Sequence, residues 1–259
     1  LPITIIISIF SFFVIILPFI TVAITSFTVN MGKPLTLSNL SLKAWEKVFS
    51  RASIISSTTN SFITATAAAF FGILISCVMA YLLQRTNVKG KRIPDFLITL
   101  GSGTPSVTIA LALIISMSGK FGINIYNTLT IMVVAYMIKY MLMGMRTVVS
   151  AMSQVHPSLE EAAQISGANW LRMLKDVTLP LIGASIVAGI FLIFMPSFYE
   201  LTMSTLLYSS NTKTIGYELY IYQTYHSQQV ASALATAILL FVILVNYILS
   251  KLTKGQFSI

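Results

Sequence analysis

Long apolar stretches alternate with short polar segments along most of the chain. An α-helix that crosses a bilayer needs roughly 20 apolar residues, and six stretches approach or exceed that length. The pattern therefore predicts an all-α, polytopic membrane protein with six transmembrane helices. The stretches cover about residues 3–27, 54–83, 96–116, 129–149, 181–207 and 230–249. The third is interrupted by the small and polar residues GSGTPS at 101–106.

Composition agrees with this pattern. The chain has 259 residues, of which 56% are hydrophobic and only 9% are charged. Soluble domains carry about 25% charged residues, so this chain could not cover a water-facing surface. Its net charge of +9 comes from scattered basic residues without an aromatic-basic motif. That charge indicates membrane topology and contact with anionic lipid rather than nucleic-acid binding.

The ends and the single cysteine add little chemistry. The first span is too long and too poorly flanked for a cleaved signal peptide. The chain begins with Leu1, so we expect residues to precede it. Cys77 lies in an apolar run, where a free buried thiol is the expected state, and one cysteine cannot form a disulfide within the chain.

The basic residues predict an orientation. With six spans, both termini share one side with the second-to-third and fourth-to-fifth loops. That side carries nine basic residues, namely Arg85, Lys89, Lys91, Arg92, Arg146, Arg172, Lys175, Lys251 and Lys254. The opposite side carries six, namely Lys33, Lys43, Lys47, Arg51, Lys120 and Lys213. The positive-inside rule therefore predicts that the termini and the fourth-to-fifth loop face the cytoplasm.

A polar insert, SLEEAAQISGANWLRMLKDVTLP, separates the fourth and fifth spans at residues 158–180. Ser158 and Glu161 have the spacing of a capping box, in which each side chain bonds the other's backbone amide. Pro157 prevents the preceding helix from continuing. Gly167 suits the left-handed position that follows a helix end. We therefore expect a helix of about two turns from Leu159 to Ser166.

A second short helix is expected next. Trp170, Leu174 and Val177 form an apolar stripe suited to packing on the ends of the spans. Pro180 removes a backbone donor and biases Leu179 away from helical geometry, so the fifth span is expected to start afresh. From these residues alone, an ordinary amphipathic loop and a docking segment explain the insert equally well.

The spacing of the insert resembles the signature loop of binding-protein-dependent ABC importer permeases of type I. The matching positions are Glu161-Ala162-Ala163, Gly167, Val177 and Leu179-Pro180. The resemblance implies one permease domain over residues 1–259, with a cytoplasmic coupling loop at 153–180. It also implies that the first short helix docks on an ATP-hydrolysing subunit. The implied docking residues are Ser158, Leu159, Glu160, Glu161, Ala162, Ala163, Ser166 and Gly167.

No nucleotide-binding P-loop accompanies this docking helix. The motif needs Gly-Lys followed by Ser or Thr, and none of the three Gly-Lys pairs has that successor. The chain is therefore expected not to be an enzyme and to hold no cofactor, with ATP and magnesium on the partner. The resemblance implies an ATPase dimer, a second permease subunit or half, an extracytoplasmic binding protein and membrane lipid as partners, in a bacterial inner membrane.

Residues 200–225 are similar to the ferric-iron branch of these permeases, which makes ferric iron the expected cargo. Two departures affect the substrate assignment: Tyr199 replaces a frequent basic residue, and HSQQ at 226–229 replaces a frequent Gly-Asp pair. Phosphonate, sugar phosphate, thiamine and polyamine remain alternatives. A secondary transporter and an intramembrane enzyme are alternatives from other classes, but neither accounts for the insert.

Two ionisable residues inside spans are candidates for the translocation path. Glu200 is expected about seven residues before the outer end of the fifth span, and Lys139 near the middle of the fourth. Such groups cost roughly 2.5–3.5 kcal/mol on insertion scales and usually face a cavity or a partner. They could form a structural ion pair, or Glu200 could act as a gate and transient ligand for iron.

Small and aromatic residues complete the expected path. Ser102, Thr104 and Ser106 either permit close helix packing or line the passage, and Tyr199 lies beside Glu200. The tyrosines of residues 217–225 could bind ferric iron but are typical of an interfacial aromatic belt. No resident metal site is assigned.

Overall fold

The computed structural model describes residues 2–252, and every regular element in that range is helical. The elements are α1 (Pro2–Ser11), α2 (Leu17–Ser26), α3 (Lys43–Ser50), α4 (Ala52–Arg85), α5 (Arg92–Gly103), α6 (Ser106–Ser116), α7 (Leu129–Gln154), α8 (Pro157–Ile165), α9 (Trp170–Met173), α10 (Leu179–Phe198), α11 (Thr202–Leu207), α12 (Ile215–Tyr225) and α13 (Gln228–Leu252). Lys254, counted above among the basic residues, lies outside the described range.

The predicted all-α membrane fold is confirmed. Five helical segments are long and apolar enough to cross a bilayer. The pair α5 and α6, bent by 111°, has the length and composition of a sixth, broken span or of a re-entrant loop. The bend falls at residues 104 and 105, inside the GSGTPS segment. The first span joins α1 to α2 through the π-helical stretch Phe12–Ile16.

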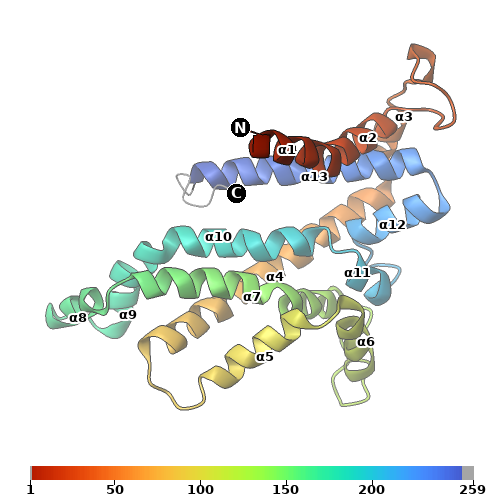
Figure 1. Cartoon of the computed structure of the whole chain (residues 1–259). Helices are drawn as coiled ribbons and strands as arrows, with labels where there is room; N and C mark the ends of the chain where they lie inside the picture. The colour runs from red at the N-terminus through yellow and green to blue at the C-terminus, as the bar shows by residue number, and fades with distance from the viewer. Residues whose placement is uncertain (1, 253–259) are drawn as a thin grey trace.

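Three long helices, α4, α7 and α10, pack together as the core of the bundle (Figure 1). Glycines lie in these contacts. A Cβ atom added to Gly144 of α7 would lie 3.1 Å from the carbonyl oxygen of Gly189 on α10. The same atom would lie 2.7 Å from the side chain of Ile193. Small residues thus let the two backbones meet, as is usual in membrane helix pairs.

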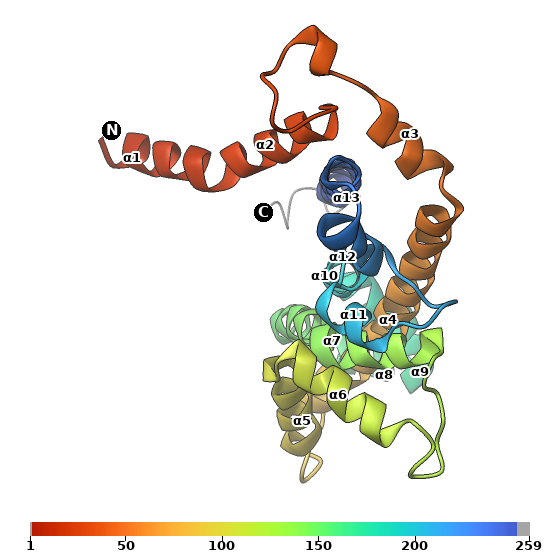
Figure 2. The ribbon, with the colours of Figure 1, turned by 90° about the vertical axis from the view of Figure 1, so that its right-hand side faces the viewer.

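The first span lies outside this core. α2 packs against α13, while α1 extends away from the rest of the molecule (Figure 2). In the most apolar window of this span, 0% of the residues are buried. Its surface within one chain is therefore free to face lipid or another polypeptide.

The fifth span differs from its prediction at both ends. Residues 170–198 form one continuous helix, so the expected fresh start after Pro180 is wrong. A π-helical stretch, Leu174–Thr178, precedes α10 and widens the turn, which accommodates the proline ring and its missing N–H. The helix ends at Phe198, and the predicted continuation to residue 207 is a separate short helix, α11.

The two ends of the bundle carry different elements. α8 and α9 lie together at one end, and α6, α11 and α12 lie at the other (Figure 1). The polar insert and the two helix breaks therefore occupy separate regions of the molecule.

Candidate functional site

Helix α8 is the predicted short helix of the polar insert, but its N-terminus is capped differently. It begins at Pro157, and the N-cap residue is His156, whose Nδ1 accepts from the Ser158 amide at 3.2 Å. The expected capping box of Ser158 and Glu161 is therefore wrong. Proline is favoured at the first helical position, which moves the start one residue ahead of Ser158.

The C-terminus of α8 agrees with its prediction. Gly167 has φ +87°, the left-handed conformation that glycine tolerates. The Gly167 amide bonds the Gln164 carbonyl at 2.9 Å, and the Ala168 amide bonds the Ala163 carbonyl at 3.0 Å. These two bonds make a Schellman motif that satisfies carbonyls at the helix end.

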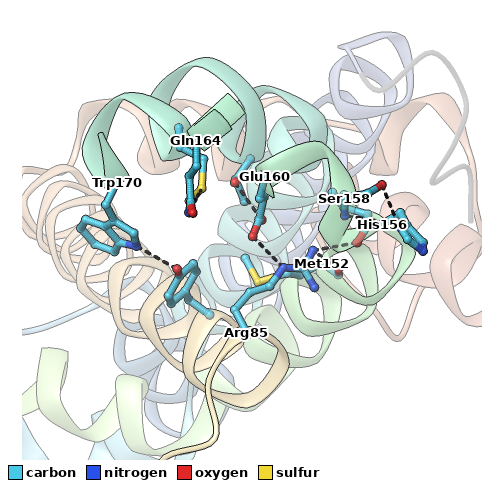
Figure 3. Close-up of polar contacts among 11 residues, drawn as sticks. Arg85, Met152, His156, Ser158, Glu160, Gln164 and Trp170 are labelled. Atoms are coloured by element: carbon cyan, nitrogen blue, oxygen red, sulfur yellow. Dashed lines mark hydrogen bonds and ion pairs between the residues drawn. The ribbon is translucent and has the colours of Figure 1, made fainter. Parts of the chain in front are cut away.

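Glu160 anchors α8 to the membrane spans (Figure 3). Its side chain accepts from Arg85 Nε of α4 at 3.0 Å and from Thr178 Oγ1 at 2.9 Å. Arg85 Nη2 also donates to the carbonyls of Met152 and Val155 at 3.2 and 2.7 Å. Glu160 is 6% exposed, so this predicted docking residue faces the protein interior.

The exposed face of α8 lacks the predicted docking residue Glu160 and includes the apolar residue Ile165, which was not predicted. Leu159 is 48% exposed, and Ile165, which the sequence analysis did not select, is 88% exposed. Glu161 and Ala162 lie between them on the exposed surface, and Ala163 is half-buried. The remaining predicted docking residues, Ser158, Ser166 and Gly167, are exposed. The i, i+3, i+6 spacing of Leu159, Ala162 and Ile165 could have predicted from the sequence that these three side chains share one face of α8.

The segment after α8 packs against α4, as the apolar stripe predicts. Trp170 Nε1 donates to the Tyr81 hydroxyl at 2.8 Å (Figure 3). Met173 is the most buried side chain of α9, and its sulfur accepts from Gln164 Nε2 at 3.2 Å. Trp170 itself remains half exposed, so the buried face is rotated slightly from the predicted stripe.

At the break between α5 and α6, Lys139 of α7 supplies hydrogen bonds. Its Nζ donates to the carbonyl oxygens of Ser102 at 3.0 Å and Thr104 at 2.8 Å. Gly101 permits this contact, because a Cβ there would lie 3.2 Å from the Ile138 carbonyl oxygen. The ammonium group thus satisfies carbonyls at the negative end of the α5 dipole.

At the break between α10 and α11, Glu200 accepts the hydrogen bonds. It lies in the non-helical residues 199–201 rather than inside a helical span, and it is 9% exposed. Its carboxylate accepts from the Tyr140 hydroxyl and from the Met203 amide, the latter at 3.0 Å. Ser204 Oγ donates to the Glu200 carbonyl oxygen at 2.6 Å.

The hypothesised ion pair between Glu200 and Lys139 is wrong. The three salt bridges found within residues 2–252 do not include it. Instead, the consecutive residues Lys139 and Tyr140 point to different breaks. Tyr140 was missed because a neutral phenol inside an apolar run gives no sequence signal of its own. Tyr199 is 42% exposed, and Ser106 is half-buried at the start of α6.

Two tyrosines of α12, Tyr217 and Tyr222, pack into the protein, whereas Tyr220 and Tyr225 are 39% and 68% exposed. Tyr222 is buried and accepts from Arg51 Nη1 at 2.9 Å. Tyr217 lies on the ring of Tyr208 with centroids 4.1 Å apart. Burial, followed by the contact with Tyr208, raises the pKa of Tyr217 to about 12. A higher pKa makes the phenolate of Tyr217 harder to form, which disfavours it as a ferric ligand.

A polar cavity of about 830 Å³ opens between α7 and α10 on the side of the polar insert. Arg146, Thr147, Ser150 and Gln154 line it from α7, and Ser185 lines it from α10. Arg146 Nη2 also contacts Asp95 of α5 at 2.9 Å. The cavity gives the polar-insert half of the bundle a hydrophilic surface that the hydropathy pattern did not indicate.

The buried position of Glu160 yields a first test. Glu160→Ala should destabilise the protein by about 3–5 kcal/mol, because it leaves the buried Arg85 guanidinium without its partner. Thermal unfolding in detergent and hydrogen exchange of residues 156–168 would measure this. Glu161→Ala is the matched control, since an exposed neighbour should change stability by about 0.5 kcal/mol or less. Equal effects of the two substitutions would contradict the anchor.

The contacts of Lys139 yield a second test. Lys139→Met keeps the apolar stem but leaves the Ser102 and Thr104 carbonyls without a donor, at about 1–3 kcal/mol for each orphaned group. Amides of residues 100–106 should therefore exchange faster with solvent. Lys139→Arg keeps the charge and donors and should preserve protection. Unchanged exchange in Lys139→Met would show that the break does not depend on this side chain.

Comparison with curated proteins finds permeases with several cargoes. The chain is 28% identical to the trehalose/maltose transport system permease protein MalG of Thermococcus litoralis, over 92% of this chain and 90% of that protein. It is 25% identical to the Fe(3+)-transport system permease protein FbpB 2 of Haemophilus influenzae, over 76% of this chain. The match spans only 39% of that longer ferric relative. It is 27% identical to the sulfate transport system permease protein CysT of Salmonella typhimurium, over 63% of this chain and 62% of that one.

Solved structures share the fold. A bacterial ABC transporter for import of the acidic polysaccharide alginate contains a chain that superimposes with TM-score 0.77 at 15% identity, over 96% of this chain and 93% of that one. Residues 72–254 match the family described as binding-protein-dependent transport system inner membrane component. That match takes in the later part of α4, all of α7 and α10, the polar insert and both breaks, and the chain belongs to this family of ABC permease subunits.

Proposed function

We propose that this chain is the transmembrane subunit of an ATP-driven importer and transmits force from a separate ATPase through α8. The observation that carries the proposal is the division of α8 into two faces. Glu160 ties the inner face to α4 and to the segment before α10, while Leu159 and Ile165 remain exposed on the outer face. A short helix that is firmly anchored yet outwardly apolar is suited to dock into a cleft of a partner.

The assembly we propose follows from the family. Two ATPase subunits would hold ATP and magnesium and hydrolyse the nucleotide, while this chain holds neither. A second permease subunit or half would complete the passage, and its contact would cover part of the exposed first span. An extracytoplasmic binding protein would deliver cargo at the end that carries α6, α11 and α12. The coupling loop and both termini would then face the cytoplasm.

The passage we propose runs from the two helix breaks to the polar cavity. Glu200 and Tyr199 lie at one break, and Ser102, Thr104, Ser106 and Lys139 lie at the other. The cavity lined by Arg146 and Gln154 would provide the exit on the coupling-loop side. Ionisable groups inside a membrane span usually mark such a route.

Ferric iron is the cargo we propose. Ferric permeases are among the curated relatives, and the carboxylate of Glu200 adjoins the phenol of Tyr199, so two oxygen groups suited to ferric iron lie together. Sugar and sulfate permeases are also among the relatives, so those cargoes are the direct competitors. Uptake of radiolabelled ferric iron, maltose and sulfate by the reconstituted complex with ATP and its binding protein would decide among them.

The docking face provides the test of the function itself. Ile165→Asp places a charge where an apolar side chain should be desolvated, and loss of one buried Ile contact is worth about 1.5–3 kcal/mol. Affinity for the purified ATPase should therefore fall roughly tenfold to a hundredfold, and ATP-driven uptake should fall with it. Leu171→Asp, at a side chain 69% exposed on α9, is the matched control.

Neither substitution should change the thermal stability of the permease alone, because both side chains are largely exposed. Unchanged ATPase affinity in Ile165→Asp would contradict α8 as the docking element. Loss of affinity in Leu171→Asp alone would move the docking surface to α9.

The role of Glu200 in transport can be separated from its role at the helix break. Glu200→Gln keeps an acceptor for the Met203 amide but removes the charge. If the carboxylate meets ferric cargo, uptake should fall about tenfold or more, as loss of a charge-assisted contact predicts. Tyr140→Phe is the control, because it removes a hydrogen bond to Glu200 but leaves the carboxylate in place.

Normal assembly with reduced iron uptake in Glu200→Gln, and near-normal uptake in Tyr140→Phe, is the expected result. Equal losses in both variants would show that Glu200 acts only as a cap for the start of α11.

A further inference from the structure

A second cavity lies behind α8, between the end of α4 and the helix that runs through α9 into α10. Its volume is about 370 Å³, and its surface is almost entirely apolar. Cys77, Val78 and Leu82 line it from α4, and Leu174 and Ile182 line it from the facing helix. This cavity has no part in the proposed passage, which runs along the other faces of α7 and α10.

The cavity lies at the ends of two candidate spans. Its α4 wall consists of the last turns before Arg85, and the facing wall includes the start of the fifth span. Tyr81 and Trp170 also line it, and they join the two walls through their hydrogen bond. Aromatic side chains with one polar end are typical of this level of the membrane.

Two lysines lie close in the chain to residues that line the cavity. Lys91 Nζ donates to the carbonyl oxygen of Leu83 at 2.8 Å and to that of the lining residue Thr86 at 2.6 Å. Lys175 is exposed and directly follows the lining residue Leu174. Neither lysine takes part in a salt bridge in the part of the chain that the structure describes. These lysines therefore place positive charge near an apolar interior.

We propose that this cavity binds one acyl chain of an anionic phospholipid, with the phosphate placed near Lys91 and Lys175. Water is a poor occupant, because an apolar cavity offers it no hydrogen-bond partners. Acyl chains are the apolar molecules that surround the protein at this depth, and the volume falls within the range of roughly 300–1,000 Å³ typical of ligand pockets. Basic residues at this level of the membrane recognise anionic headgroups.

From its position in the cavity, the lipid would stabilise the contact between α4 and the α9–α10 helix. Its two walls belong to α4 and to the α9–α10 helix, which are the elements that Glu160 joins through Arg85 and Thr178. An acyl chain between these walls would fill the space beside the anchor and hold the two helices at a set separation. Anionic lipid would thereby stabilise the position of α8 against the spans.

Cys77 reports occupancy directly, because it lines the cavity and is the chain's single cysteine. The experiment reconstitutes the complex in vesicles of phosphatidylcholine, with or without phosphatidylglycerol. N-ethylmaleimide modification of Cys77 is then followed by peptide mass. Phosphatidylglycerol should slow the modification, and native mass spectrometry should find it retained on the complex. Lys175→Gln should weaken the protection about fivefold, the effect expected for one basic side chain at a membrane surface.

Two tryptophan substitutions locate the lipid. Val78→Trp should fill the cavity from its membrane side, where Val78 is 60% exposed, and should make Cys77 modification slow in both vesicles. Leu74→Trp lies one turn earlier on α4, at a side chain 48% exposed that does not line the cavity. It should leave the lipid dependence unchanged.

Equal Cys77 modification in the two kinds of wild-type vesicle would overturn the proposal. So would a lipid-dependent rate that persists in Val78→Trp, since the lipid would then lie elsewhere. Protection by phosphatidylcholine alone would overturn the selection of an anionic headgroup. None of these measurements requires transport, so their outcome is independent of the cargo and of ATPase docking.

Discussion

Inside a bilayer, every backbone group that a helix break leaves unpaired must find a partner within the protein. A sharp bend separates α5 from α6, and a second interruption separates the end of α10 from the short helix α11. Both breaks are satisfied from the same unbroken helix. Lys139 donates to the carbonyls that end α5, while Tyr140 donates to the carboxylate that caps α11. The arrangement of the passage therefore depends on α7, which places two consecutive side chains at two separate interruptions.

The other end of α7 takes part in a second buried polar arrangement. Arg85 bonds the carbonyls of Met152 and Val155 at the end of α7 and pairs with Glu160 of α8. Buried ion pairs contribute little net stability compared with apolar packing, because both charges lose their hydration. Their geometry is nonetheless strict, since a displaced partner leaves a charge buried alone. The pair thus fixes where α8 lies against α4 and α7 rather than simply strengthening the fold.

The sequence predicted five of the spans, the interruption at GSGTPS, the short helix of the insert and its glycine end. Those features depend on length, hydropathy and local backbone chemistry, and each of these can be judged from a short stretch of sequence. It could not separate Glu160 from Glu161, because adjacent acids of one helix face differ only through partners such as Arg85, 75 residues away. One of two hypotheses paired Lys139 with Glu200, whereas the partners of Lys139 are backbone carbonyls. The N-cap was mispredicted because Pro157 starts α8 one residue before Ser158, which makes His156 the cap. The continuous helix through Pro180 was mispredicted because the π-helical turn before α10 accommodates the proline.

These two polar arrangements lie on one rigid element. Residue 139 is separated from residue 152 by 13 positions, or roughly 20 Å of helix at 1.5 Å per residue. Gly144 lies between them and packs against Gly189, so α7 and α10 are in backbone contact over this interval. A displacement of α8 would be imposed on the end of α7 through Arg85 and carried along α7 to Lys139 and Tyr140. Because those residues hold both breaks, one rigid movement of α7 would alter both at the same time. Such a connection needs no flexible relay between the docking helix and the passage, only the two buried contacts and a helix without an interruption between them.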